Sequence, residues 1–122
     1  VRLRRALANL PSQAVFEVLE ALMQDPAPSQ RLVAVSGLLA YASPGSVRQL
    51  GKALADPDLG VRIATLKALS ELRSSRVQGV PESLRQVTHA IGKLANSADV
   101  EEKRLARHLY YQLMGRLPES GR

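Results

Sequence analysis

The stretch Leu54-Ala-Asp-Pro-Asp-Leu-Gly-Val-Arg-Ile-Ala-Thr-Leu-Lys-Ala-Leu69 decides the fold of this chain. Its Asp-Pro-Asp run has the composition of a tight turn, and the residues after it have the apolar spacing of a helix over 59–73. At about 100° per residue, that helix has two apolar stripes on nearly opposite sides, formed by Val61, Ala64, Ala68 and Leu72 and by Leu59, Ile63 and Leu66. A helix with two such stripes packs between neighbours on both sides.

Proline and glycine divide the rest of the chain into further segments of helical length. Between these breaks the sequence predicts seven helices and no strands, over 1–10, 12–24, 29–42, 46–55, 59–73, 82–96 and 99–116. We expect Ser12, Ser46 and Asp99 to be N-caps, because their side-chain oxygens can accept from free N–H groups of a first turn.

Composition agrees with a single helical domain. The 122 residues include 45% hydrophobic and 3% aromatic residues and no tryptophan, which favours helix over sheet. The absence of cysteine excludes disulfides, thiolate zinc sites and cysteine nucleophiles. The longest apolar run, 32–42, is about half a membrane span, and Glu17 and Glu20 interrupt any signal-peptide core. We therefore expect no transmembrane segment and a cytoplasmic protein.

Internal repeats indicate how the helices are arranged. Ser46-Val-Arg-Gln-Leu-Gly-Lys-Ala-Leu54 aligns with Ser83-Leu-Arg-Gln-Val-Thr-His-Ala-Ile91, with four of nine positions identical. A second repeat relates Asp25-Pro26 and Arg31 to Asp56-Pro57 and Arg62, because each residue is separated from its counterpart by the same distance along the chain. Periods of about 30 to 40 residues built from helix pairs are typical of an α-solenoid.

The stretch 54–69 resembles a HEAT repeat of the short-period kind found in bacteria, and armadillo repeats are similar. The family pattern is a helix, a tight turn with aspartate, and a second helix that opens with Val-Arg, here Val61-Arg62. The resemblance implies an all-α superhelix of antiparallel pairs: a helix of an incomplete repeat at 1–10, repeats at 12–42 and 46–73, a degenerate repeat at 81–114 and a tail at 115–122. In the last repeat, Asn96 stands for the turn aspartate and Lys103 or Arg104 for the arginine.

Four charged residues are expected to have a structural role. Asp25 precedes Arg31 by six residues, and Asp56 precedes Arg62 by six, each pair spanning a turn into a helix. The HEAT resemblance implies a ladder, in which the turn aspartate caps backbone N–H groups and pairs with an arginine of its own or the next repeat. These arginines are therefore excluded from any ligand-binding patch.

Two surfaces remain as candidates for a partner. The resemblance places the second helix of each pair on the concave side, where the polar positions are Ser36, Lys67, Glu71, His108 and Gln112. The first helices have a stronger cationic stripe on the convex side, formed by Arg48, Lys52, Arg85, His89 and Lys93, next to a helix that carries Glu17 and Glu20. This basic patch fits either a solvated face or an acidic partner, an anionic lipid or nucleic acid.

No catalytic or metal-binding constellation is visible in the sequence. His89 and His108 fall on different expected helices, and neither has a second ligand at helical spacing. The adjacent side chains of Glu101 and Glu102 diverge by about 100° on a helix and cannot share a proton. Tyr110-Tyr111 is expected to close the end of the core with one ring exposed. We expect neither a cofactor nor a metal.

The sequence therefore predicts a non-enzymatic protein–protein interaction or scaffold module. The main alternative is a nucleic-acid-binding domain similar to the HEAT-like DNA glycosylases. The chain has one Phe and no Trp, so the aromatic platforms for stacking bases are missing. A HEAT-like chromophore lyase is a further alternative, resting on fold analogy alone.

The helix expected at the amino end has an apolar face that we expect to be covered by another segment or molecule. Val1, Leu3, Leu7 and Leu10 give the opening helix an apolar face, and its own helical partner would lie upstream of Val1. We therefore expect the chain to be a fragment of a longer protein, or to self-associate through this helix.

Overall fold

The computed structural model describes residues 12–119, and the expected helix at 1–10 lies outside this range. The described part consists of helices α2 (Ser12–Met23), α3 (Pro28–Ala40), α4 (Pro44–Ala53), α5 (Leu59–Leu72), α6 (Val80–Gln86), α7 (Thr88–Leu94) and α8 (Val100–Met114). It contains no strand. The predicted all-α class is therefore confirmed.

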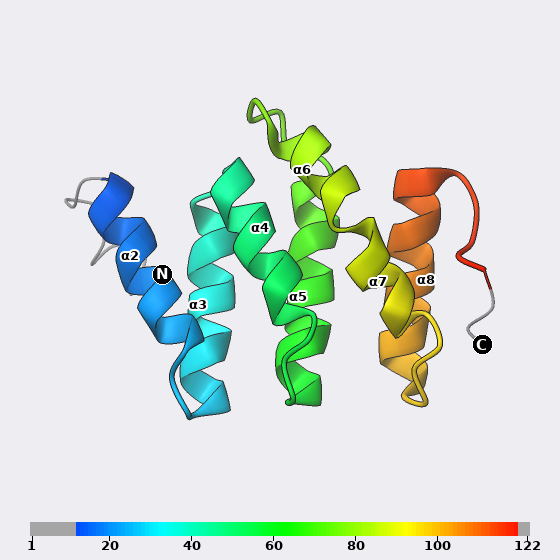
Figure 1. Ribbon diagram of the computed structural model, residues 1–122, viewed down its shortest axis with the longest axis horizontal. Helices are drawn as coiled ribbons and strands as arrows, with labels where there is room; N and C mark the ends of the chain where they lie inside the picture. Colours follow the sequence, from blue (N-terminus) through cyan, green and yellow to red (C-terminus); the bar gives the residue numbers. More distant parts are fainter. Residues whose placement is uncertain (1–11, 120–122) are drawn as a thin grey trace.

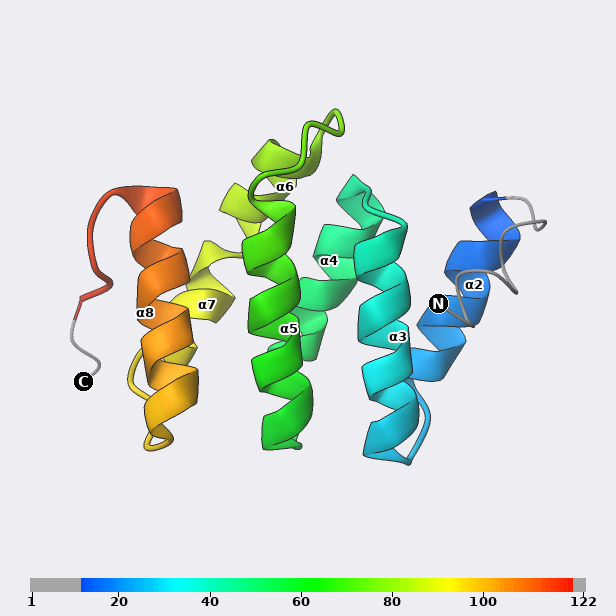
Figure 2. The same ribbon diagram turned by 180° about the vertical axis from the view of Figure 1, so that it is seen from behind.

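The helices form two layers in a linear array. Figure 1 shows α2, α4 and the α6–α7 segment in front, and Figure 2 shows α3, α5 and α8 side by side on the opposite side. Each second helix packs against the second helix of the next pair, α3 against α5 and α5 against α8, while α2, α4 and α7 pack against α3, α5 and α8. This nearest-neighbour packing is that of an α-solenoid.

The core lies between the two layers and runs along the whole array. Its largest fully buried side chains are apolar, with one exception, Glu102. The helix α5 is buried on both flanks, as expected for an interior helix, and Leu66 and Leu69 are completely inaccessible. Leu59 and Ile63 of the second expected stripe are only half-buried.

Side-chain caps begin three of the described helices. Asp58 accepts a hydrogen bond from the N–H of Val61 at the start of α5, and Asp99 caps α8 as predicted. The prediction that Ser46 is an N-cap is wrong, because Ser43 accepts from the N–H of Ser46 and α4 begins at Pro44. Proline fits the first helical position, where its missing N–H costs nothing, so the cap precedes it.

The expected cap at Ser12 has a different outcome. Ser12 is itself the first residue of α2, so a cap would stand one residue earlier, outside the described range.

One predicted helix is interrupted. The sequence predicts a continuous helix over 82–96, but the structure breaks it at Val87, whose φ of −103° and ψ of 7° are not helical. The N–H of Val87 bonds to the carbonyl of Leu84, and the hydroxyl of Thr88 donates to the carbonyl of Arg85. The break lets α6 pack against α4 while α7 packs against α8.

Candidate partner-binding surfaces

Arg31 joins the first described repeat to the second. Its Nε donates to Oδ2 of Asp56 at 2.7 Å and its Nη2 to Oδ1 at 3.0 Å, while Nη1 donates to the carbonyl oxygens of Asp25 and Pro26. The planar guanidinium therefore holds its own turn with one edge and the carboxylate of the next turn with another.

Arg62 makes the equivalent connection one repeat later. Its Nη1 donates to the carbonyl oxygens of Asp56 and Pro57 at 2.9 and 3.2 Å. Its Nε and Nη2 donate to the carboxylate of Glu102 at 2.6 and 3.4 Å. The structure thus brings Asp56 and Arg62 together through the main chain of the turn, while their side chains pair with the preceding and the following repeat.

The candidate concave residues form a row across α3, α5 and α8, which we call the second-helix row. Ser36, Lys67 and His108 each lie five residues after the ladder position of their own helix, so they occupy equal register positions. Those ladder positions hold Arg31, Arg62 and Lys103.

The second-helix row is open to solvent along its length. It is completed by Glu71 and Gln112, which each lie one helical turn beyond a first member of the row. All five residues are exposed. One side chain takes part in an ion pair, since Nζ of Lys67 lies 3.6 Å from a carboxylate oxygen of Glu101.

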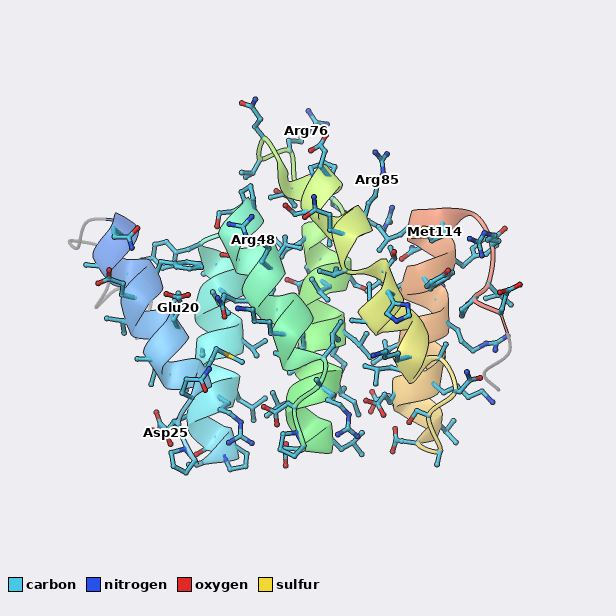
Figure 3. All side chains as sticks on the ribbon, viewed as in Figure 1. Glu20, Asp25, Arg48, Arg76, Arg85 and Met114 are labelled. Carbon is cyan, nitrogen blue, oxygen red and sulfur yellow. The ribbon has the colours of Figure 1, made fainter. Side chains whose placement is uncertain are left out.

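The candidate basic residues Arg48, Lys52, Arg85, His89 and Lys93 are all exposed in the first-helix layer. Arg48 and Lys52 lie on α4, whereas His89 and Lys93 lie on α7. Arg85 belongs to α6, on the other side of the break at Val87, and Figure 3 shows it apart from Arg48. Glu20 of the neighbouring α2 accepts a hydrogen bond from Gln49.

Comparison with known families identifies this arrangement. A family described as HEAT repeats matches residues 15–106, which is more than half of the chain. The chain belongs to the HEAT-repeat family. No curated protein and no solved structure matches it. HEAT repeats are commonly protein-interaction scaffolds and are typically non-catalytic.

In the third HEAT repeat, two residues share the two roles that Asp56 has in the second repeat: accepting a backbone N–H of the turn and pairing with the arginine of the preceding repeat. Asp56 accepts both the N–H of Asp58 and the guanidinium of Arg31. In the third repeat, Oγ of Ser97 accepts the N–H of Asp99, and the carboxylate of Glu102 receives the preceding arginine. The turn position is therefore Ser97 and not Asn96, which the sequence suggested.

Glu102 is the ladder residue that sequence reasoning missed. Only 2% of it is exposed, and besides Arg62 it receives the hydroxyl of Ser97 at 2.6 Å, while its own N–H bonds to Asp99. The sequence shows only two adjacent glutamates in a first turn, which suit the helix dipole equally. Glu102 lies 40 residues after Arg62. This separation could distinguish Glu102 from Glu101 only if the length of the third repeat were already known.

Three ladder charges of this HEAT array stay ionised near neutral pH. Burial raises the pKa of Asp56, but the hydrogen bonds from Arg31 and from the N–H of Asp58 outweigh it, so that its pKa is lowered. The hydrogen bond to Asp56 raises the pKa of Arg31, and that to Glu102 raises the pKa of Arg62. Both guanidiniums are paired with carboxylates of the next repeat and therefore contribute no free cation to either candidate surface.

The described HEAT repeats show no cluster for metal chemistry. Among residues 12–119, no three His, Cys, Asp or Glu side chains are placed to hold a metal ion together. Within the same range no helix has the length and apolar content needed to cross a bilayer. Tyr111 is exposed on α8, while Tyr110 is half-buried beside Gly92.

Proposed function

We propose that this chain is a non-enzymatic protein-interaction module, and that its partner protein binds along the second-helix row. The observation that carries the proposal is the register of the row. Ser36, Lys67 and His108 recur at the same place relative to the ladder positions, and each is exposed on its helix. A linear array of equivalent side chains offers an extended surface, which is how solenoids present their binding faces.

The chemistry of the row supports a protein partner over a nucleic acid. It combines a hydroxyl, an ammonium, a carboxylate, an imidazole and an amide. A phosphate backbone is bound by several uncompensated cations. Here Arg31 and Arg62 face carboxylates, and Lys67 lies near Glu101. The part of the chain that the structure describes has 13 Lys and Arg against 11 Asp and Glu.

An exposed aromatic ring lies beside the row and strengthens the proposal. Tyr111 is 55% exposed and follows His108 by three residues on α8, so both occupy the same side of the helix. Tyrosine is enriched among the residues that dominate protein–protein binding energies, because it combines apolar area with a hydroxyl.

Site-specific photo-crosslinking in cells tests the proposal. We would replace Lys67 or His108 by the photoreactive residue p-benzoylphenylalanine and identify the crosslinked species by mass spectrometry. Glu82, which is exposed on α6 in the other layer, provides the matched control position. The expected result is one protein captured from both row positions and absent from the control.

Two outcomes would contradict this function. Capture of nucleic acid from Lys67 and His108 would favour the nucleic-acid-binding alternative. Capture of the same protein from the Glu82 position but from neither row position would place the partner on the first-helix layer instead.

A further inference from the structure

A second surface lies at the last described repeat, away from the second-helix row. A hollow of about 510 Å³ opens between α7, α8 and the segment that follows α8. It is lined by His89, Gly92, Lys93, Asn96, Tyr110, Arg116, Pro118 and Glu119. Figure 1 shows the segment after α8 turning back along the outer side of that helix. Its size lies within the usual range for ligand pockets, about 300 to 1,000 Å³.

The hollow lies where the first helix of a following repeat would pack. Gly51 of α4 faces the next repeat so closely that a Cβ atom there would lie 2.6 Å from Cγ1 of Val87. Gly92 occupies the equivalent place one repeat later, because both glycines are followed by lysine and lie five residues before the turn position of their repeat.

At Gly92 the neighbouring atoms belong to α8 and to the segment after it, and not to a following repeat. A Cβ atom there would lie 3.2 Å from the ring of Tyr110 and 3.7 Å from Pro118. The segment after α8 therefore covers part of the space that α6 and α7 fill one repeat earlier.

The lining of the hollow combines cations with an apolar floor. Lys93, His89 and Arg116 are exposed, and within the described range none of them has an ion pair or a side-chain hydrogen bond. The amide of Asn96 adds a donor and an acceptor. Tyr110 and Pro118, both half-buried, contribute the apolar part.

The same lining indicates which kind of anion fits. The carboxylate of Glu119 lies among the cations and repels a dense polyanion such as a nucleic acid backbone. A peptide can place carboxylates against Lys93 and Arg116 and an apolar side chain over Tyr110. Carboxylate pairing with lysine and arginine together with aromatic contact is typical of the residues that anchor peptide ligands.

We propose that this hollow binds a short acidic peptide segment of a partner protein that also carries apolar side chains. This site shares no residue with the second-helix row, although both use α8, and it does not depend on the function proposed for that row.

Fluorescence anisotropy with a defined peptide tests this site. The probe is a fluorescein-labelled peptide of about eight residues with the repeating pattern Glu-Glu-Leu, compared with the same peptide carrying Gln for Glu. The full chain is compared with the double variant Lys93→Glu, Arg116→Glu. The matched control is the double variant Arg48→Glu, Lys52→Glu, which makes the same change of charge at exposed positions of the first-helix layer.

The expected result is specific to the hollow. Affinity for the acidic peptide falls at least about tenfold in the Lys93→Glu, Arg116→Glu variant and by less than about threefold in the control variant, since only the former lines the hollow. The Gln peptide binds at least about tenfold more weakly than the acidic one. Both variants are expected to stay folded, because the four positions are exposed, and circular dichroism checks this.

Three outcomes would overturn the proposal. The acidic peptide does not bind, both double variants lose affinity equally, or a single-stranded oligodeoxythymidylate of similar length binds more tightly with the same dependence on Lys93 and Arg116. Because the crosslinking positions Lys67 and His108 lie outside the hollow, failure here leaves the result for the second-helix row intact, and the reverse also holds.

Discussion

Arg31 and Asp56 lie 25 residues apart in sequence and form a two-point ion pair, with N–O distances of 2.7 and 3.0 Å, that joins successive repeats. The side chains of both residues are largely buried, at 12% and 6% exposure. An ion pair in this position depends on both members, because the loss of either carboxylate or guanidinium leaves the other, largely buried charge without an opposite charge beside it.

The substitution Asp56→Asn is therefore expected to destabilise the chain by about 2 to 3 kcal/mol. The measurement is the free energy of unfolding in urea, with the slope unchanged. Asp25→Asn is the matched control, since the Asp25 carboxylate accepts the N–H of Ala27 and, among the described residues, pairs with no guanidinium. The control is expected to cost about 1 kcal/mol or less. Equal losses in the two variants would contradict the role given to the ion pair.

Stability is expected to fall in acid partly through Asp56. Its pKa in the folded chain is below the ordinary 3.8, so the folded state favours the ionised form. The contribution is complete above the unfolded value, and it is lost as the pH falls through the lower folded value. Urea unfolding between about pH 6 and pH 3 is expected to show a shallower decline in Asp56→Asn than in the parent chain. Parallel declines in the two proteins would show that the ionisation of Asp56 does not contribute to the loss of stability in acid.

Two adjacent glutamates are expected to respond very differently to the same change. Glu102→Gln removes the buried partner of Arg62 and is expected to cost about 3 kcal/mol. Glu101→Gln removes only an exposed contact with Lys67 at 3.6 Å and is expected to cost less than about 1 kcal/mol. The thermal midpoints of the two variants give the comparison directly. A larger loss in Glu101→Gln would mean that the connection to the third repeat is misassigned.

The contact between Gly51 and Val87 can be tested by adding and removing methyl groups. Gly51→Ala is expected to destabilise by about 1 to 3 kcal/mol, because the new Cβ would lie 2.6 Å from Cγ1 of Val87. Combining it with Val87→Ala is expected to recover part of that loss, which a double-mutant cycle measures as a coupling energy. If the losses of stability in Gly51→Ala and Val87→Ala simply add in the double variant, residues 51 and 87 are not in contact.

The pattern of apolar residues and turns predicted the helices, their pairing and the solenoid, because each depends on local sequence. The positions of Arg31, Asp56 and Arg62 could also be found, since the turn and its arginine recur at a constant spacing. The expected pairing was wrong, because the carboxylate of Asp56 binds the arginine of the preceding repeat and not one of its own or the next. Glu102 could not, because its choice over Glu101 depends on how α8 is rotated against α5. The break at Val87 was missed for a similar reason: the helical pattern continues through it, and packing on two different neighbours interrupts it.

The length of the first-helix segment in the third repeat explains both misses. Ser83 and Ser97 are four residues further apart than Ser46 and Asp56, which occupy the equivalent positions. This extra helical turn moves the third turn out of the period that the first two repeats set, and it separates α6 from α7. Local propensity does not report such an insertion, because one more turn keeps the apolar face in phase.

The regularly spaced arginines Arg31 and Arg62 are paired with carboxylates of the ladder. The remaining surface carries charges of both signs, which suits a protein partner. Binding of duplex DNA by the full chain across a salt series tests this most directly. We predict weak binding, with a slope of log affinity against log salt no steeper than about −3. Submicromolar affinity near physiological salt with a slope of about −5 or steeper would contradict it, because such binding requires about six free cations on one surface.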